Sequence, residues 1–180
     1  ITGAVRTACD ALDPDRLAAL AAPLVSANRV WVLTGETSMA GGRVLESGLS
    51  MVRPNVQLVR EHSTGRDLSG AAPGDAAAVF DFARYRRGPI TAARTLADLG
   101  VTIVAITDGP LSPLAALTDH WCQLEIPAVG PFDSSLPAVA AAELLIARVA
   151  SDLGRAARDR IDQLETIWRA NGTWVKARAD

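Results

Sequence analysis

Four short polar segments hold most of the side chains that could bind a ligand, and each follows an apolar run or precedes an expected helix. The segments lie at residues 34–38, 81–87, 107–109 and 133–135. Free backbone N–H groups at a helix start favour an anion, although a hydroxyl there can also be a simple helix cap. Because several such segments can converge, we predict a ligand site formed by Thr34, Thr37, Ser38, Asp81, Arg84, Arg86, Ser134 and Ser135.

The most charged of these segments is "DFARYRR" at residues 81–87. An arginine offers a planar set of donors that suits a carboxylate or a phosphate, whereas Asp81 repels an anion unless it is paired. We therefore expect Asp81 to pair with Arg84 or Arg86, or to hold the hydroxyl end of an acidic sugar, and Arg87 to be solvated. The alternative is that all three arginines face water or a second copy of the chain, contributing about 1 kcal/mol or less each.

Catalytic and metal-binding chemistry has less support in the sequence. Glu36 and Glu61 could act as bases, but no partner acid can be named for either. His62 could contact a ligand, although we expect it to be solvated, and His120 is interpreted as structural. No dinucleotide or phosphate-loop glycine motif occurs, and no His/Cys/carboxylate cluster has metal-ligand spacing. We therefore expect no catalysis, no metal and no cofactor.

Composition indicates one packed domain. The chain has 180 residues, 49% of them hydrophobic, with a net charge of −2 and a pI near 5.7. This near-neutral charge argues against nucleic-acid binding by the segment itself. The richest apolar stretch, 136–150, is interrupted by Glu143 and Arg148, so no membrane span is expected. Two cysteines without motif spacing and no visible signal peptide fit a cytoplasmic protein.

Apolar runs separated by turn residues predict the elements that position these segments. Strands are expected near residues 30–34, 56–60, 76–82, 101–106 and 121–126. Helices are expected near 2–12, 14–25, 39–51, 89–99, 135–149 and 153–170, with a short helix after Ser112. A loop that could hold one helical turn is expected at 62–74, and a further loop at 127–131. Strands that alternate with helices and are apolar throughout are typical of a parallel sheet covered on both faces. We predict a single α/β domain, a Rossmann-like three-layer α/β/α sandwich with a five-stranded parallel sheet.

The last expected helix carries an apolar stripe at helical spacing. Leu153, Ala157, Ile161, Leu164 and Trp168 form this stripe, and a further tryptophan follows it. Exposed stripes of this kind usually mark a partner surface, so we expect a homodimer. The alternative is that the stripe packs on its own domain.

Five segments occur in the sequence in this order: "RVWVLTGETSMA", "MVRPNVQLV", "APGDAAAVFDFARYRR", "LGVTIVAITDGPLSPLAALTDHWCQL" and "PFDSS". In this order they resemble the sugar isomerase (SIS) domain, especially that of RpiR/MurR-type bacterial transcriptional regulators. The resemblance covers roughly residues 4–154, and "AITDGPLSPLAALTDH" is its most specific part. It implies an α/β/α sandwich that binds phosphosugars or related metabolites.

In such regulators an N-terminal helix-turn-helix domain binds DNA, and the ligand changes repression or activation. The chain begins at Ile1 rather than Met, and no such domain precedes it. We therefore expect the effector domain of a longer regulator, which would reach DNA only through the missing N-terminal domain.

Two family motifs are altered. The family's first turn is commonly G-x-G-x-S, and "TGETS" at 34–38 keeps only Ser38. The family's phosphate loop is typically S-x-S-G-x-T, and the aligned "DFARYR" at 81–86 lacks both serines, the glycine and the threonine. Some regulators of this family carry Arg-Tyr in this loop, and the family's late serine matches Ser134 or Ser135.

Three functions follow from the resemblance. The leading hypothesis is a sensing and dimerising domain for a sugar phosphate or sugar acid. The second is a phosphosugar isomerase, which must move a proton between adjacent carbons and so needs a positioned base. The third is a dimerisation scaffold with a degenerate pocket, which the lost serines favour.

Overall fold

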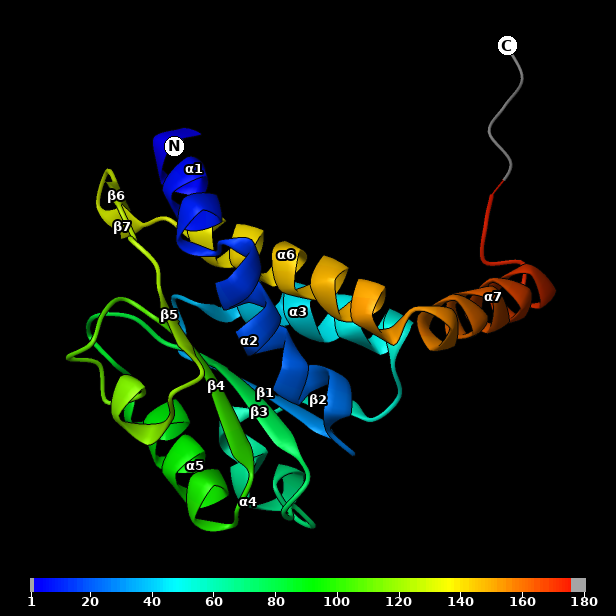
Figure 1. The fold of residues 1–180 in the computed structure, drawn as a ribbon, viewed down its shortest axis with the longest axis horizontal. Helices are drawn as coiled ribbons and strands as arrows, with labels where there is room; N and C mark the ends of the chain where they lie inside the picture. Colours follow the sequence, from blue (N-terminus) through cyan, green and yellow to red (C-terminus); the bar gives the residue numbers. More distant parts are fainter. Residues whose placement is uncertain (1, 176–180) are drawn as a thin grey trace.

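The sheet at the centre of the molecule has five strands in the order β2-β1-β3-β4-β5 (Figure 1). The computed structural model describes residues 2–175. Its strands are β1 (Val30–Thr34), β2 (Val56–Leu58), β3 (Ala76–Phe80), β4 (Thr102–Thr107) and β5 (Trp121–Gln123). Every neighbouring pair in this sheet is parallel. The predicted α/β fold is confirmed.

The strands send alternate side chains into two cores, one on each face of the sheet. In β3, Ala78 and Phe80 pack into one core, whereas Ala77 and Val79 pack into the other. All residues of β3 are buried. A strand that is covered on both faces can carry apolar residues at every position, which explains the continuous apolar runs of the sequence.

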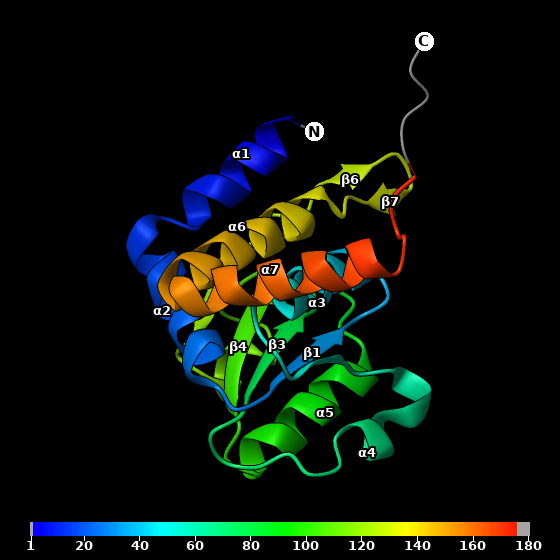
Figure 2. The same cartoon turned by 90° about the vertical axis from the view of Figure 1, so that its right-hand side faces the viewer.

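Helices form a layer on each face of the sheet (Figure 2). One layer contains α1 (Thr2–Ala11), α2 (Pro14–Ser26), α3 (Met39–Val52) and α6 (Leu136–Leu153), and the other contains α4 (Thr64–Asp67) and α5 (Arg87–Asp98). Two short 3-10 helices are η1 (Glu61–Ser63) and η2 (Ala115–Leu117). The last helix, α7 (Arg155–Ala170), packs against α3 and α6. Within residues 2–175, no helix combines the length and the apolar character needed to cross a membrane.

A small hairpin stands where a loop was expected. In it, β6 (Ala128–Val129) pairs antiparallel with β7 (Phe132–Asp133). Gly130, in the turn between them, has a φ of +62°, which glycine adopts without steric cost. β1 has the predicted bounds and β4 is displaced by one residue, whereas β2, β3 and β5 end two to three residues earlier than predicted.

Close packing of α3 on α6 fixes where these two helices begin, near the carboxyl ends of the strands. A Cβ atom added to Gly41 of α3 would lie 2.8 Å from the Cβ of Ala138 in α6. One added to Gly48 would overlap the side chain of Ile146. The two glycines therefore let the helix backbones approach closely, and both helices begin beside the loops that follow the strands.

Arg53 closes the carboxyl end of α2 from within the protein. Its guanidinium donates hydrogen bonds to the backbone oxygens of Leu24 and Ala27, the latter at 2.6 Å, and its Nε donates to that of Pro54 at 3.2 Å. The side chain is buried, and burial lowers the pKa of Arg53. A cation at this helix end satisfies carbonyls that the helix itself leaves free.

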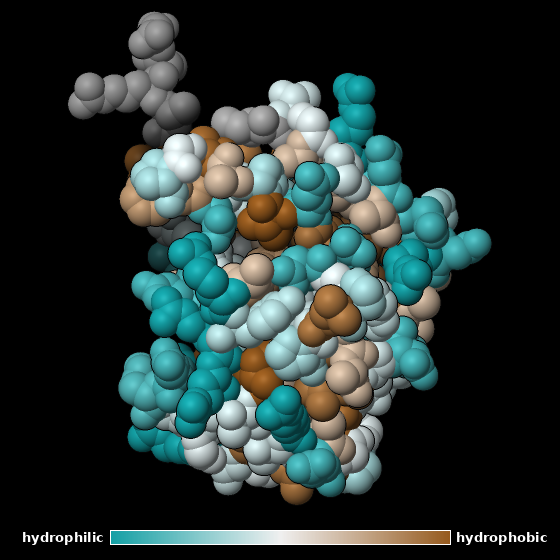
Figure 3. All heavy atoms as spheres, turned by 90° about the vertical axis from the view of Figure 1, so that its left-hand side faces the viewer, coloured by the Kyte–Doolittle hydropathy of each residue, from teal (hydrophilic) through white to brown (hydrophobic). Residues whose placement is uncertain are grey.

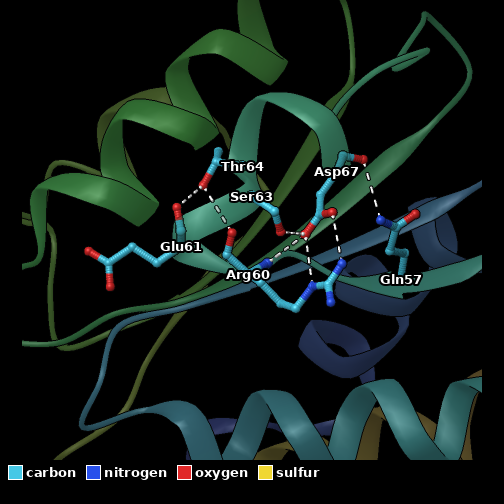
Figure 4. A network of polar contacts seen from close by, with 6 residues as sticks. All are labelled: Gln57, Arg60, Glu61, Ser63, Thr64 and Asp67. Carbon is cyan, nitrogen blue, oxygen red and sulfur yellow. Dashed lines mark hydrogen bonds and ion pairs between the residues drawn. The ribbon is translucent and has the colours of Figure 1, made fainter.

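The segment after β2 is held by the carboxylate of Asp67 (Figure 4). This carboxylate accepts hydrogen bonds from the backbone N–H of Arg60 at 3.0 Å and from the hydroxyl of Ser63 at 2.8 Å, and it lies 3.3 Å from the Arg60 guanidinium. These donors hold the pKa of Asp67 well below its usual range. The network ties Arg60 and η1 to α4, while Glu61 points away from it (Figure 4).

We predict that Arg53→Ala lowers the free energy of unfolding by about 2 to 3 kcal/mol, because it leaves buried carbonyls without donors. Urea unfolding followed by circular dichroism measures this change. The matched control is Arg66→Ala, which removes an exposed arginine and should act within about 0.5 kcal/mol. Equal effects of the two substitutions would show that the Arg53 hydrogen bonds do not stabilise the fold.

We predict that Asp67→Asn lowers the thermal unfolding midpoint at pH 7. The folded-state pKa of Asp67 is depressed, so its stabilisation is present above the unfolded pKa of about 3.9 and is lost as the pH falls through the folded value. The difference from the wild type should therefore shrink below about pH 4. Asp162→Asn, at an exposed position of α7, is the control and should show no such pH dependence.

Candidate functional site

The strand order places the candidate site between β1 and β3. The connection after β1 leads to α3 on one face of the sheet, and the connection after β3 leads to α5 on the other. Ligands of open parallel sheets bind beyond the carboxyl ends of the strands at such a switch point. Figure 3 shows this end of the molecule, where hydrophilic side chains surround separate hydrophobic ones.

A cleft of about 560 Å³ opens at this position and is called here the main cleft. It is enclosed by the end of β1 and its loop, the start of α3, the segment after β2 and the start of α5. Its charged and titratable residues are Arg43, Arg60, Arg86, Glu36, Glu61 and His62. The other lining residues include Leu33, Leu58 and Val59, so the main cleft combines apolar and charged side chains.

The three arginines of the main cleft differ in their partners. Arg60 is held by Asp67, and Arg86 forms an ion pair with Glu36 in which both side chains are more than half exposed. Arg43 makes no ion pair with any residue between 2 and 175. An exposed ion pair contributes little to stability, so an anion that enters the cleft can meet both Arg43 and Arg86.

Ser38 lies beneath the main cleft and not in it. It is fully buried, and its hydroxyl lies 2.7 Å from the backbone oxygen of Phe80 and 3.1 Å from that of Gly35. The hydroxyl therefore joins the turn after β1 to the end of β3. This contact accounts for a serine at this position without a ligand.

Asp81 is also buried, with 1% of its surface exposed. Its carboxylate accepts hydrogen bonds from the backbone N–H of Arg86 at 2.8 Å and from that of Phe82 at 3.2 Å. Burial raises the pKa of Asp81 to about 6, against the opposing effect of these two N–H groups. The expected pairing of Asp81 with the side chain of Arg84 or Arg86 is wrong, because the two guanidinium groups pair with Asp133 and Glu36.

The remaining predicted site residues are dispersed. Thr34 lines the main cleft, whereas Thr37 is exposed in the turn after β1. The hydroxyl of Ser134 accepts a hydrogen bond from the N–H of Leu136 at 3.3 Å, as a cap at the start of α6. Ser135 precedes α6 directly and makes no side-chain capping bond. Thus Thr34 and Arg86 share the main cleft, and the two late serines do not line it.

A second cleft of about 510 Å³ lies beside the loops after β3 and β4. Arg84 pairs with Asp133 on its rim at 2.9 Å. Asp108 accepts hydrogen bonds from the Tyr85 hydroxyl at 2.5 Å and from the N–H of Ala83 at 2.8 Å, and burial together with this carboxylate raises the pKa of Tyr85. The two aspartates of this cleft, Asp108 and Asp133, are therefore engaged by residues of the loop after β3 and brace that loop.

Sequence reasoning missed two residues of the main cleft, Arg43 and Arg60. Arg43 stands in the first turns of a helix that was predicted correctly, and its distance of five residues from Ser38 was the available signal. Arg60 lies two residues after the end of β2, at the same carboxyl end of the sheet. Among residues 2–175, no group of three or more histidine, cysteine or carboxylate side chains is arranged to hold a metal ion.

Comparisons with solved structures agree with this fold. The sugar isomerase domain of an RpiR transcription factor from Sphaerobacter thermophilus is 23% identical, with a TM-score of 0.81 over 92% of this chain and 95% of that one. The Vibrio vulnificus NanR protein complexed with ManNAc-6P is 17% identical, with a TM-score of 0.74 over 94% and 68%. A hypothetical protein from Methanococcus jannaschii, for which the solved structure infers a molecular function of 3-hexulose-6-phosphate isomerase, is 15% identical. Its TM-score is 0.73 over 90% of this chain and 93% of that one.

These identities are below 25%, so the similarities show the fold alone. No curated protein matches this sequence. The model of the SIS domain matches residues 23–148, which include the main sheet and the loops after its strands. Because this match covers more than half of the chain, the protein belongs to the SIS domain family.

Proposed function

We propose that this SIS domain is the ligand-sensing and dimerisation domain of an RpiR-type transcriptional regulator, and that it binds a sugar phosphate or sugar acid in the main cleft. The observation that carries the proposal is the set of three arginines around one cleft, of which Arg43 has no ion-pair partner within residues 2–175. DNA contact would come from a helix-turn-helix domain joined to this one.

The electrostatics of the main cleft favour an anionic ligand. Arg86 and Arg43 approach the cleft from α5 and α3, on opposite sides of the sheet. Arginine forms charge-assisted, often bidentate hydrogen bonds with carboxylate and phosphate groups. An entering anion can replace Glu36 on Arg86, because both members of that ion pair are largely exposed. The carboxylates of the cleft remain available for the hydroxyl groups of a sugar.

The solved structures support this class of ligand. NanR was crystallised with ManNAc-6P, a sugar phosphate. The TM-score with the RpiR domain, 0.81, is higher than that with the inferred hexulose-phosphate isomerase, 0.73. The fold is common to regulators and isomerases, so the side chains of the cleft must distinguish these two functions.

The second candidate function is a phosphosugar isomerase. Glu36, Glu61 and His62 all line the main cleft, and a carboxylate and an imidazole are suitable groups for general base and acid catalysis. Against this, no hydrogen bond or ion pair joins the side chain of His62 to Glu36, Glu61 or any other carboxylate in the described part of the chain, so no acid–base pair is assembled. We therefore propose sensing without turnover.

We predict that an anionic sugar found by a thermal-shift screen of sugar phosphates and sugar acids binds more weakly to Arg43→Ala and Arg86→Ala. Each substitution should cost about 1.5 to 3 kcal/mol, or roughly ten- to hundredfold in affinity, as measured by isothermal titration calorimetry. Arg84→Ala is the matched control, because it removes the same charge from the same loop outside the main cleft. It should leave affinity nearly unchanged.

Two outcomes would overturn this assignment. If no sugar phosphate or sugar acid shifts the unfolding temperature, the domain is a dimerisation scaffold. If an aldose or ketose phosphate is isomerised, and turnover disappears in Glu61→Gln or His62→Ala while binding persists, the domain is an enzyme.

The apolar stripe of α7 is divided between the domain and solvent. Ala157 is buried and Ile161 packs against the core below α7, whereas Ile167 and Trp174 are 46% and 62% exposed. The rings of Trp168 and Trp174 pack edge to face, and their centroids are 5.7 Å apart. The stripe through Ile161 therefore packs on its own domain, whereas Ile167 and Trp174, which lie beside and beyond its second half, are available to a second copy.

We predict a homodimer at tens of micromolar in light scattering, and we expect the double variant Ile167→Arg with Trp174→Arg to be monomeric, because charges would enter an apolar contact. Thr166→Arg, at an exposed polar position of the same helix, is the control and should stay dimeric. A monomeric wild type would contradict the proposed assembly.

A further inference from the structure

The loop after β3 is folded around a carboxylate of the chain itself, that of Asp81. We infer that the carboxylate of Asp81 occupies two backbone donors of this loop, the N–H groups of Phe82 and Arg86, which a phosphate could otherwise use, so that the acidic group of a ligand binds at Arg43 and Arg86 instead. The second half of this inference rests on the proposed function. The first half concerns the loop alone.

The backbone of Asp81 is fixed from the sheet side. Its N–H donates to the carbonyl of Ile106 at 3.2 Å, and its own carbonyl accepts a hydrogen bond from the Thr107 hydroxyl at 2.8 Å. The carboxylate then turns back into the loop, where it receives the N–H groups of Phe82 and Arg86. The segment 81–86 is therefore folded around a negative charge that belongs to the chain.

The position is one where an external anion would otherwise be favoured. Arg86 directly precedes α5, which begins at Arg87. The first N–H groups of a helix have no acceptor within the helix, and they carry the positive end of its dipole. Phosphate and carboxylate groups bind at such places. Here the N–H that leads into α5 is already taken by Asp81.

Asp81 also lies directly behind the wall of the main cleft. Gly35 lines the cleft, and a Cβ atom added to it would overlap Oδ1 of Asp81. The absence of a side chain at Gly35 is therefore what makes room for this carboxylate. A phosphate placed against this wall would meet a negative charge, and the N–H groups of Phe82 and Arg86 would not be free to bind it. Arg43, which also lines the cleft, is free of any ion pair within residues 2–175.

The protonation state of Asp81 sets the strength of this exclusion. Burial raises its pKa to about 6, and the charged groups that act on it are Arg86 and Asp108; Glu36 is paired with the Arg86 side chain. The carboxylate is thus mostly ionised at pH 7.5 and mostly protonated at pH 5. A ligand that suits this site is a sugar whose acidic group reaches Arg43 and Arg86 and does not depend on the loop.

The test uses Asp81→Ala, which removes the carboxylate and leaves the two N–H groups and the vacated space. Formate is the probe, because it has the charge and size of the group removed. In this variant, the amide resonances of Phe82 and Arg86 should shift with formate in a saturable manner by NMR, and formate should raise the unfolding temperature. In the wild type, the same resonances should not respond, and the apparent affinity should be at least about tenfold weaker, equivalent to about 1.4 kcal/mol.

Two controls separate this role from general charge effects. Asp133→Ala removes a carboxylate from the neighbouring hairpin, with the same change in net charge, and should give no formate response at Phe82 and Arg86. Asp81→Asn keeps the side-chain volume, so it should not bind formate at these amides. Inorganic phosphate added to Asp81→Ser tests whether a larger anion is also admitted.

The inference fails if formate or phosphate moves the Phe82 and Arg86 amides of the wild type as strongly as those of Asp81→Ala, or if the variant does not respond. Should Asp81→Ala not fold, the formate titration is repeated with Asp81→Ser, which also removes the carboxylate, and the absence of a response at the Phe82 and Arg86 amides would contradict the role. Lack of sugar binding by the wild type would overturn the proposed function alone, since formate tests only the loop.

Discussion

One carbonyl oxygen, that of Phe80, holds the two loops of the candidate site together. It is the last acceptor of β3, and it receives the N–H of Gly35 at 3.0 Å and the hydroxyl of Ser38 at 2.7 Å. These groups come from the turn after β1, in the neighbouring strand. Because all three groups are buried, losing either donor would leave the Phe80 oxygen with one hydrogen bond in place of two and would weaken the link between the loops. The position of α3, and so of Arg43, depends on this contact.

The polar groups of the site consequently fall into two sets. The buried set includes Ser38, Asp81 and Thr107, and each of these side chains is engaged with the backbone, that of Asp81 within its own loop and those of Ser38 and Thr107 with the segment at the end of β3. The exposed set consists of charged side chains around the main cleft. Arg86 and Glu36 form an exposed ion pair, and Arg43 forms no ion pair within residues 2–175. Only the second set can exchange partners without breaking the loops. The buried groups therefore shape the main cleft, whereas the exposed groups can bind a ligand in it.

The fold could be predicted from the sequence because burial on both faces requires continuous apolar strands, and these runs marked all five strands of the main sheet. The site could be predicted only in part. Arg84 and Arg86 are two residues apart, yet Arg84 has a φ of +69°. Arg86 lines the main cleft, whereas the side chain of Arg84 pairs with Asp133 outside it. Arg43 was missed because its place depends on the packing of α3, where Gly42 lies against Thr34. Neither a local turn nor a helix contact of this kind follows from composition or periodicity.

Arg86 belongs to both sets, and this explains how a rigid loop can carry an exchangeable charge. Its backbone N–H is fixed by the carboxylate of Asp81, while its guanidinium stands in the cleft with Glu36. A change of partner at the guanidinium therefore requires only rotation of the side chain, and the start of α5 stays in place. A preorganised backbone of this kind lowers the entropic cost of binding. The same aspartate that denies the loop to a ligand thus holds the neighbouring arginine ready for one.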